Sequence, residues 1–190
     1  MISNNPDITL WNAFKKGDSG SFELIFRKYY GPLLQYGCKL TRDEELLEDC
    51  IQELFTELWQ NKSQTDVFSV KAYLFKALKY KLFRALQKKY AYRSAAEPAD
   101  LLFELSHETF IVSREETEER KEKVIKALDQ LTSRQKEIIY LKFYQGLGYD
   151  EVSEIMNINY QVARNLLYQS IKSLKKILTG FSALLVLLNQ

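Results

Sequence analysis

The chain has 190 residues and a net charge of only +2; 46% of its residues are hydrophobic and 27% are charged. That balance excludes a disordered chain and allows a packed core in one medium domain or two small ones. Glycine and proline are scarce, at seven and three residues, so we expect long helices rather than an architecture of strands and turns.

The first expected elements are a short amphipathic stretch at residues 8–17 and a helix that begins after Asp18. Asp18 has the chemistry of an N-cap, and apolar residues then recur at helical spacing as far as Cys38. Pro32 lies inside this pattern and should kink or split the helix. Because the N-terminal residues lack a basic start followed by an apolar run, we expect no secretory signal and a cytoplasmic location.

Residues 43–61 give the clearest helical pattern, with an apolar face opposite an acidic one. Residues 41–66 contain eight acids and two bases. An acidic face beside an aromatic residue favours protein binding, because tryptophan is enriched in hot spots. The alternative is an ordinary solvated face. The residues that share this exposed side are Asp49, Gln52, Glu53 and Glu57, with Trp59 following.

Residues 69–90 predict another helix, in a stretch that combines aromatic rings with eight bases and no acid between residues 69 and 93. Single-stranded nucleic acid is bound by this combination, since cations follow the backbone and rings stack on unpaired bases. Phe75 and Phe83 are expected in the core. Leu78, or Lys79 in its place, can also point inward, but the bases of this helix, Lys79 among them, cannot all be buried and are expected to form a solvated face. The alternative is a core helix whose rings are packed. The candidate nucleic-acid contacts are Tyr73, Lys76, Lys79, Tyr80, Lys81, Arg84 and Lys88.

Residues 94–121 are expected to be an acidic linker. Nine acids and three bases lie between residues 97 and 122. The stretch also holds too many apolar residues for a simple tether, Leu101 and Phe103 among them, so part of it should dock. We expect the linker to let two domains sit apart on DNA.

From about residue 117 the pattern is helical again, and Thr132 is expected to cap a helix. Residues 150–156, a turn at 157–159 and a helix at 160–178 have the spacing of a helix-turn-helix, in which the small Ala163 permits a close crossing. The exposed start of the second helix of such a motif faces base edges in the major groove. The alternative is a plain helical hairpin. The candidate DNA contacts are Tyr160, Gln161, Arg164, Asn165 and Lys172.

The remaining features predict no catalytic chemistry. Two cysteines and one histidine offer no zinc ligand set at the usual spacings, so Cys38 and Cys50 are expected as reduced core residues. We expect no metal, no cofactor and no small-molecule substrate. The apolar tail at 181–189 is too short to span a bilayer, which needs about 20 residues.

The order and spacing of these motifs resemble the extracytoplasmic-function sigma factors of the sigma-70 family, over almost the whole chain. Asp49, Gln52, Glu53, Phe55 and Trp59 match the family segment that holds the polymerase clamp. Residues 71–89 match the segment that reads and melts the promoter −10 element, and the stretch from Leu131 matches the start of the −35-reading domain. Departures at Tyr80, Arg84, Thr132 and residues 159–161 leave the class intact and the promoter sequence open.

The resemblance implies an all-α fold with helical domains at residues 1–93 and 122–190, the second a helix-turn-helix, joined by the linker at 94–121. It implies a factor that is not an enzyme, binds core RNA polymerase and recognises promoter DNA as duplex and as melted strand. Family members are often held by an anti-sigma factor. The alternative function is a stand-alone helix-turn-helix regulator. A nuclease has little support, because paired acids such as Glu44 and Glu48 lie on a solvated face.

Overall fold

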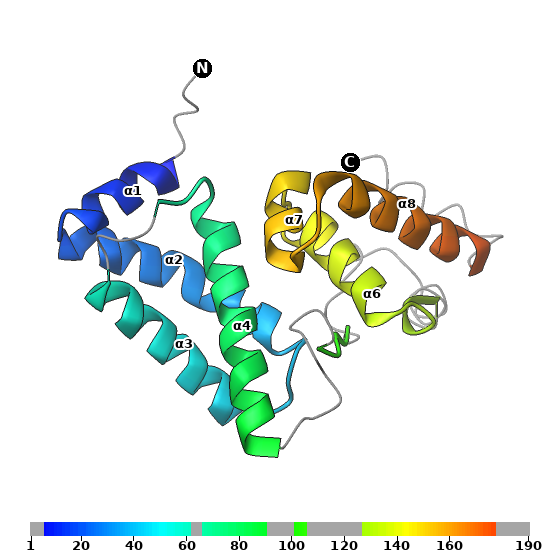
Figure 1. Cartoon of the computed structure of the whole chain (residues 1–190), viewed down its shortest axis with the longest axis horizontal. Coiled ribbons are helices and arrows are strands. Elements are labelled where there is room, and N and C mark those ends of the chain that lie inside the picture. Colours follow the sequence, from blue (N-terminus) through cyan, green and yellow to red (C-terminus); the bar gives the residue numbers. More distant parts are fainter. Residues whose placement is uncertain (1–5, 62–65, 91–100, 106–126, 178–190) are drawn as a thin grey trace, which may run out of the picture.

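The computed structural model describes residues 6–61, 66–90, 101–105 and 127–177, and the regular elements within these ranges are all helical (Figure 1). They confirm the expected all-α fold. The elements are α1 (Pro6–Lys15), α2 (Ser19–Gly37), α3 (Glu44–Gln60), α4 (Val70–Tyr90), α6 (Ser133–Ile139), the π-helical turn η3 (Tyr140–Tyr144), α7 (Tyr149–Met156) and α8 (Tyr160–Ile177).

Local capping determines where several helices begin. The Asp18 carboxylate accepts a 2.9 Å hydrogen bond from the backbone N–H of Ser21, which confirms Asp18 as the N-cap of α2. Thr132 caps α6 in a reciprocal capping box with Gln135. Pro32 does not split α2, which runs unbroken from Ser19 to Gly37. The buried residues on both sides of this proline hold the helix in place by tertiary packing, which offsets the missing backbone donor.

Helices α1 to α4 pack into an N-terminal helical domain. Gly37 at the end of α2 permits the close approach of α3, because a Cβ atom there would lie only 2.1 Å from Cδ1 of Leu47. Cys50 is buried in this domain as expected, but Cys38 is exposed. Cys38 is the C-cap of α2, where the chain leaves the helix, so helical spacing no longer decides which way its side chain faces.

The C-terminal helices form the expected helix-turn-helix. Val152 and Ile155 on its first helix and Ala163 and Leu167 on its second helix are buried. The turn depends on Asn157, which adopts a left-handed conformation with φ of 53° and ends α7.

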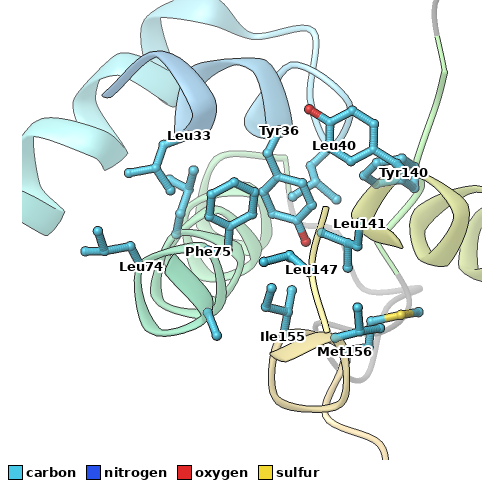
Figure 2. Close-up of a cluster of buried hydrophobic side chains, with 14 of the residues drawn as sticks. Leu33, Tyr36, Leu40, Leu74, Phe75, Tyr140, Leu141, Leu147, Ile155 and Met156 are labelled. Carbon is cyan, nitrogen blue, oxygen red and sulfur yellow. The ribbon is translucent and has the colours of Figure 1, made fainter. Parts of the chain in front are cut away.

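The two groups of helices share one continuous core. Helix α4 packs directly against α7 (Figure 1), and the hydroxyl of Tyr36 in α2 donates a hydrogen bond to Glu137 in α6. Figure 2 shows Tyr36 from α2, Phe75 from α4 and Ile155 from α7 pointing into a single apolar cluster. The protein is therefore closed on itself, with α4 between the two domains.

Part of the acidic linker docks in this core. Leu101 and Phe103 are buried, and the backbone N–H of Glu104 donates a 2.8 Å hydrogen bond to the carbonyl of Lys39. The rest of the linker and the tail at 181–189 lie outside the described residues. Within the described ranges, none of the helices has the length and apolar character needed to cross a membrane.

Candidate nucleic-acid interface

A groove of about 830 Å³ runs between α3 and α4 and has walls of opposite charge. Helix α4 supplies both rings and cations to one wall, and α3 supplies carboxylates to the other. The α4 side includes Tyr73, Tyr80, Lys81, Arg84 and Lys88, and the α3 side includes Asp49, Glu53 and Glu57. The groove therefore gathers most of the residues that the sequence predicted for single-stranded DNA.

The cations of this groove differ in how far their charge is already compensated. The Lys81 ammonium donates a 2.7 Å hydrogen bond to Glu57 and lies 3.5 Å from a carboxylate oxygen of Glu53. Arg84 and Lys88 are exposed, and neither has an ion-pair partner within the described part of the chain. These two side chains offer the least compensated positive charge for a phosphate backbone.

The tyrosines of α4 also differ in availability. The Tyr73 ring is half-buried and packs edge-to-face on the buried Trp11, with ring centroids 5.3 Å apart. Tyr80 is half-buried at the groove, and no ring contact of Tyr80 occurs among the described residues. The side chain of Tyr90 lies outside the described residues. Tyr80 is therefore the described ring best placed to stack on a base.

Lys79 departs from the expected solvated basic face. Its side chain is only 2% exposed, and its ammonium lies 2.7 and 2.8 Å from the two carboxylate oxygens of Glu137 in α6. The Tyr36 hydroxyl donates a 2.6 Å hydrogen bond to the same carboxylate. Burial, together with the charge of Glu137, raises the pKa of Tyr36 well above its usual value. This pairing compensates the burial of the Lys79 charge.

A second, apolar groove of about 410 Å³ lies between α2 and α3. Trp59 lines it and is half-buried, with its ring centroid 5.1 Å from that of Phe22. Gln52 and Phe55 also line it, whereas Asp49 and Glu53 line the groove beside α4. The candidate polymerase contacts thus divide between two faces of α3. Phe26 also lines this groove and was not among the predicted contacts, although its four-residue spacing from Phe22 is typical of a helix face.

The candidate −35 contacts all lie on exposed positions of α8. Gln161 and Asn165 are joined by a 3.2 Å hydrogen bond between their side-chain amides. Tyr160 packs edge-to-face on Tyr149, with ring centroids 5.5 Å apart. Tyr168, which the sequence pattern did not single out, is 63% exposed. The complete predicted set is Tyr160, Gln161, Arg164, Asn165 and Lys172, and each of these side chains is open to solvent.

The chain matches two parts of one family. The model described as Sigma-70 region 2 matches residues 25–100, and the model described as Sigma-70, region 4 matches residues 121–174. The chain belongs to the sigma-70 family. It is an RNA polymerase sigma factor of the extracytoplasmic-function group.

Two relatives of this sigma factor carry the same group name. It is 24% identical over 153 residues to the ECF RNA polymerase sigma factor SigM of Bacillus subtilis (strain 168), covering 80% of this chain and 92% of that protein. It is 23% identical over 176 residues to the ECF RNA polymerase sigma factor SigK of Mycobacterium ulcerans (strain Agy99), covering 89% and 91%.

Solved structures share the fold of this sigma factor. CnrH, in complex with the cytosolic domain of CnrY, superposes with a TM-score of 0.59 at 16% identity, covering 94% of this chain and 100% of that one. The sigma factor RpoE of Bartonella quintana, in complex with the anti-sigma factor NepR, has a TM-score of 0.57 at 17% identity, with coverage of 84% and 97%.

In the described ranges, no cluster of three or more histidine, cysteine or acidic side chains could hold a metal ion.

Proposed function

We propose that separate surfaces of this sigma factor bind polymerase, melt the −10 element and read the −35 element. The apolar α2–α3 groove and the exposed polar face of α3 bind the core enzyme. This assignment is supported by half-buried aromatic rings beside exposed polar groups, with Trp59 next to Gln52. Asp49 and Glu53 add negative charge at the opposite edge of α3, beside the groove of α4.

The α3–α4 groove captures the melted −10 strand. Arg84 and Lys88 bind the phosphate backbone, Lys81 contributes less because Glu57 already neutralises it, and Tyr80 stacks on an unpaired base. Lys76 and Lys79 extend the cationic surface along α4 when the C-terminal domain moves away. Tyr73 supports this surface through Trp11.

The start of α8 enters the major groove of the −35 element. Its exposed arginine and amide side chains are the groups that read guanine and adenine edges. Arg164 is the proposed guanine contact, while Gln161 and Asn165 act together because they are already hydrogen-bonded. Tyr160 and Lys172 lie at exposed positions before and after these residues, where they can touch the DNA backbone.

The proposed partners are core RNA polymerase, promoter DNA and an anti-sigma factor. RpoE of Bartonella quintana has a partner of that last class, NepR, and shares this fold. We propose that the chain works in the cytoplasm beside polymerase, which performs the chemistry of RNA synthesis. The sigma factor itself supplies base recognition and capture.

The α3–α4 groove is the observation that supports this proposal most directly, because Tyr80 and the exposed side chains of Arg84 and Lys88 line the same groove. Transcription with purified core polymerase on a genomic DNA library, followed by mapping of start sites, tests it. We expect start sites that share a −10 and a −35 sequence and that are lost with Tyr80→Ala combined with Arg84→Ala. Start sites unchanged by this pair of substitutions would overturn the assignment of the groove.

A further inference from the structure

The first turn of α8 is held in place by local contacts. The Asn159 side chain caps the helix, because its Oδ1 atom accepts a 2.8 Å hydrogen bond from the backbone N–H of Val162. The Tyr160 ring packs edge-to-face on Tyr149 at the start of α7, with ring centroids 5.5 Å apart. The backbone from which the proposed −35 contacts project is therefore ordered before DNA binds.

Gln161 and Asn165 are linked by their side chains one turn apart on α8. The Gln161 Nε2 group donates a 3.2 Å hydrogen bond to the Oδ1 atom of Asn165. Side chains four residues apart on a helix are neighbours, and a glutamine can bond in this way to an asparagine or aspartate one turn later. Both side chains are exposed, so neither fills the core of the domain. The consequence of this bond is that it fixes the direction of the Gln161 amide.

The bond leaves Gln161 with one donor and one acceptor for DNA. An amide nitrogen carries two hydrogens, of which Asn165 binds one. The second hydrogen and the Oε1 atom make no hydrogen bond to any residue that the structure describes. Adenine presents the complementary pair in the major groove, an N7 acceptor and an N6 donor, whereas guanine presents two acceptors. With the amide held in this direction, Oε1 would face an acceptor of guanine, so adenine is favoured.

We propose that Asn165 positions the Gln161 amide, so that the first turn of α8 selects adenine at one position of the −35 element. Gln161 contacts the base, and Asn165 acts through Gln161. This inference rests on the proposed entry of α8 into the major groove of the −35 element. If the two residues instead contacted separate bases, each would control its own position; as a positioned pair, both control the same one.

Substitutions at the two residues have different expected effects. Gln161→Ala removes the bidentate contact, so the preference for adenine should fall by about tenfold. Gln161→Glu leaves only acceptors and should shift the preference to cytosine, whose N4 group donates. Asn165→Ala releases the Gln161 amide and should lower the adenine preference by about twofold, the size of one such side-chain bond. Asn165→Asp keeps the acceptor and should retain the preference, although its charge weakens binding to every sequence.

The experiment measures binding of the reconstituted holoenzyme to promoter DNA with a randomised −35 element. Sequencing of the bound fraction gives the base preference at each position, and filter binding gives the overall affinity. Thermal unfolding of each free variant checks the fold, which these exposed substitutions should leave unchanged. The matched control is Gln169→Ala, which removes another exposed amide of α8 further from its start and should alter no base preference.

The outcomes separate positioning from direct contact and from the proposed function. A loss of adenine preference at one position in both alanine variants, with the preference kept in Asn165→Asp, supports the positioning. A new preference for cytosine at a second position in Asn165→Asp would overturn it, because Asn165 would then read a base of its own. An unchanged adenine preference in Gln161→Ala or in Asn165→Ala would also overturn it. A wild-type holoenzyme without preference at any −35 position would overturn the proposed −35 role of α8, and this inference with it.

Discussion

The Lys81 ammonium in α4 donates a 2.7 Å hydrogen bond to the Glu57 carboxylate in α3, across the groove proposed for the −10 strand. The Lys81 side chain is only 18% exposed, whereas that of Glu57 is 59% exposed. This ion pair joins the basic helix α4 to the acidic helix α3, and it already neutralises the charge of Lys81. The basic residues of α4 should consequently make unequal contributions to DNA binding.

Arg84→Ala should weaken the salt dependence of DNA binding more than Lys81→Ala does. Removal of one cation that binds a single-strand phosphate should reduce the slope of log K against log salt by about 0.7. Arg84 is exposed and releases counterions when it binds a DNA phosphate. Lys81 only exchanges the Glu57 carboxylate for a phosphate, so it releases fewer counterions. The measurement is holoenzyme affinity for a promoter fragment at several salt concentrations. Equal slope changes for the two variants would show that Glu57 does not compensate Lys81.

Tyr80→Ala should block promoter opening and spare duplex binding, because a stacking ring is needed only once a base is unpaired. Tyr73→Ala should instead lower the stability of the fold, since its edge-to-face contact with Trp11 contributes about 0.5–1.5 kcal/mol beyond buried area. Permanganate footprinting of unpaired thymines with the holoenzyme measures opening, and thermal unfolding measures stability. If Tyr80→Ala opens DNA as well as the wild type does, the base must be captured by another ring or by residues 61–68.

Gln52→Ala combined with Glu53→Ala should weaken core polymerase binding without changing the fold. Both side chains are exposed on α3, so their removal leaves no cavity. Trp59→Ala is a poorer test, because its ring packs on Phe22 and its removal should also destabilise the domain. A pull-down with core polymerase, checked by circular dichroism, measures the effect. Glu45→Ala, another exposed acid of α3, serves as the control and should bind normally.

Arg164→Ala should relax promoter preference at one position of the −35 element. Removing a bidentate guanine contact costs about 1–3 kcal/mol for the preferred sequence and little for others. Lys172→Ala, further along α8, should weaken all sequences equally, as expected for a phosphate contact. Selection of binding sites from a randomised −35 pool measures both variants. If Arg164→Ala also weakens every sequence alike, Arg164 binds phosphate rather than a base.

Much of the architecture follows from residues close together in the chain. Asp18 and Thr132 each cap a helix through a backbone N–H three residues ahead, so these starting points could be read directly from the sequence. Apolar spacing likewise identified the helix-turn-helix, in which Ala163 is fully buried. The exposed start of α8 follows from the same local periodicity.

The sequence by itself determined the helices, their apolar faces and the residue types that DNA and polymerase require. Only the tertiary structure decided that Lys79 is buried, because its partner Glu137 lies 58 residues further along the chain. It likewise decided that Tyr73 packs on Trp11, which leaves Tyr80 as the more available ring. Helical periodicity specifies which face a residue occupies, but it does not specify which distant segment covers that face. The free energy that selects the covering segment comes from burial and ion pairing between segments far apart in the sequence, which only the folded chain brings together.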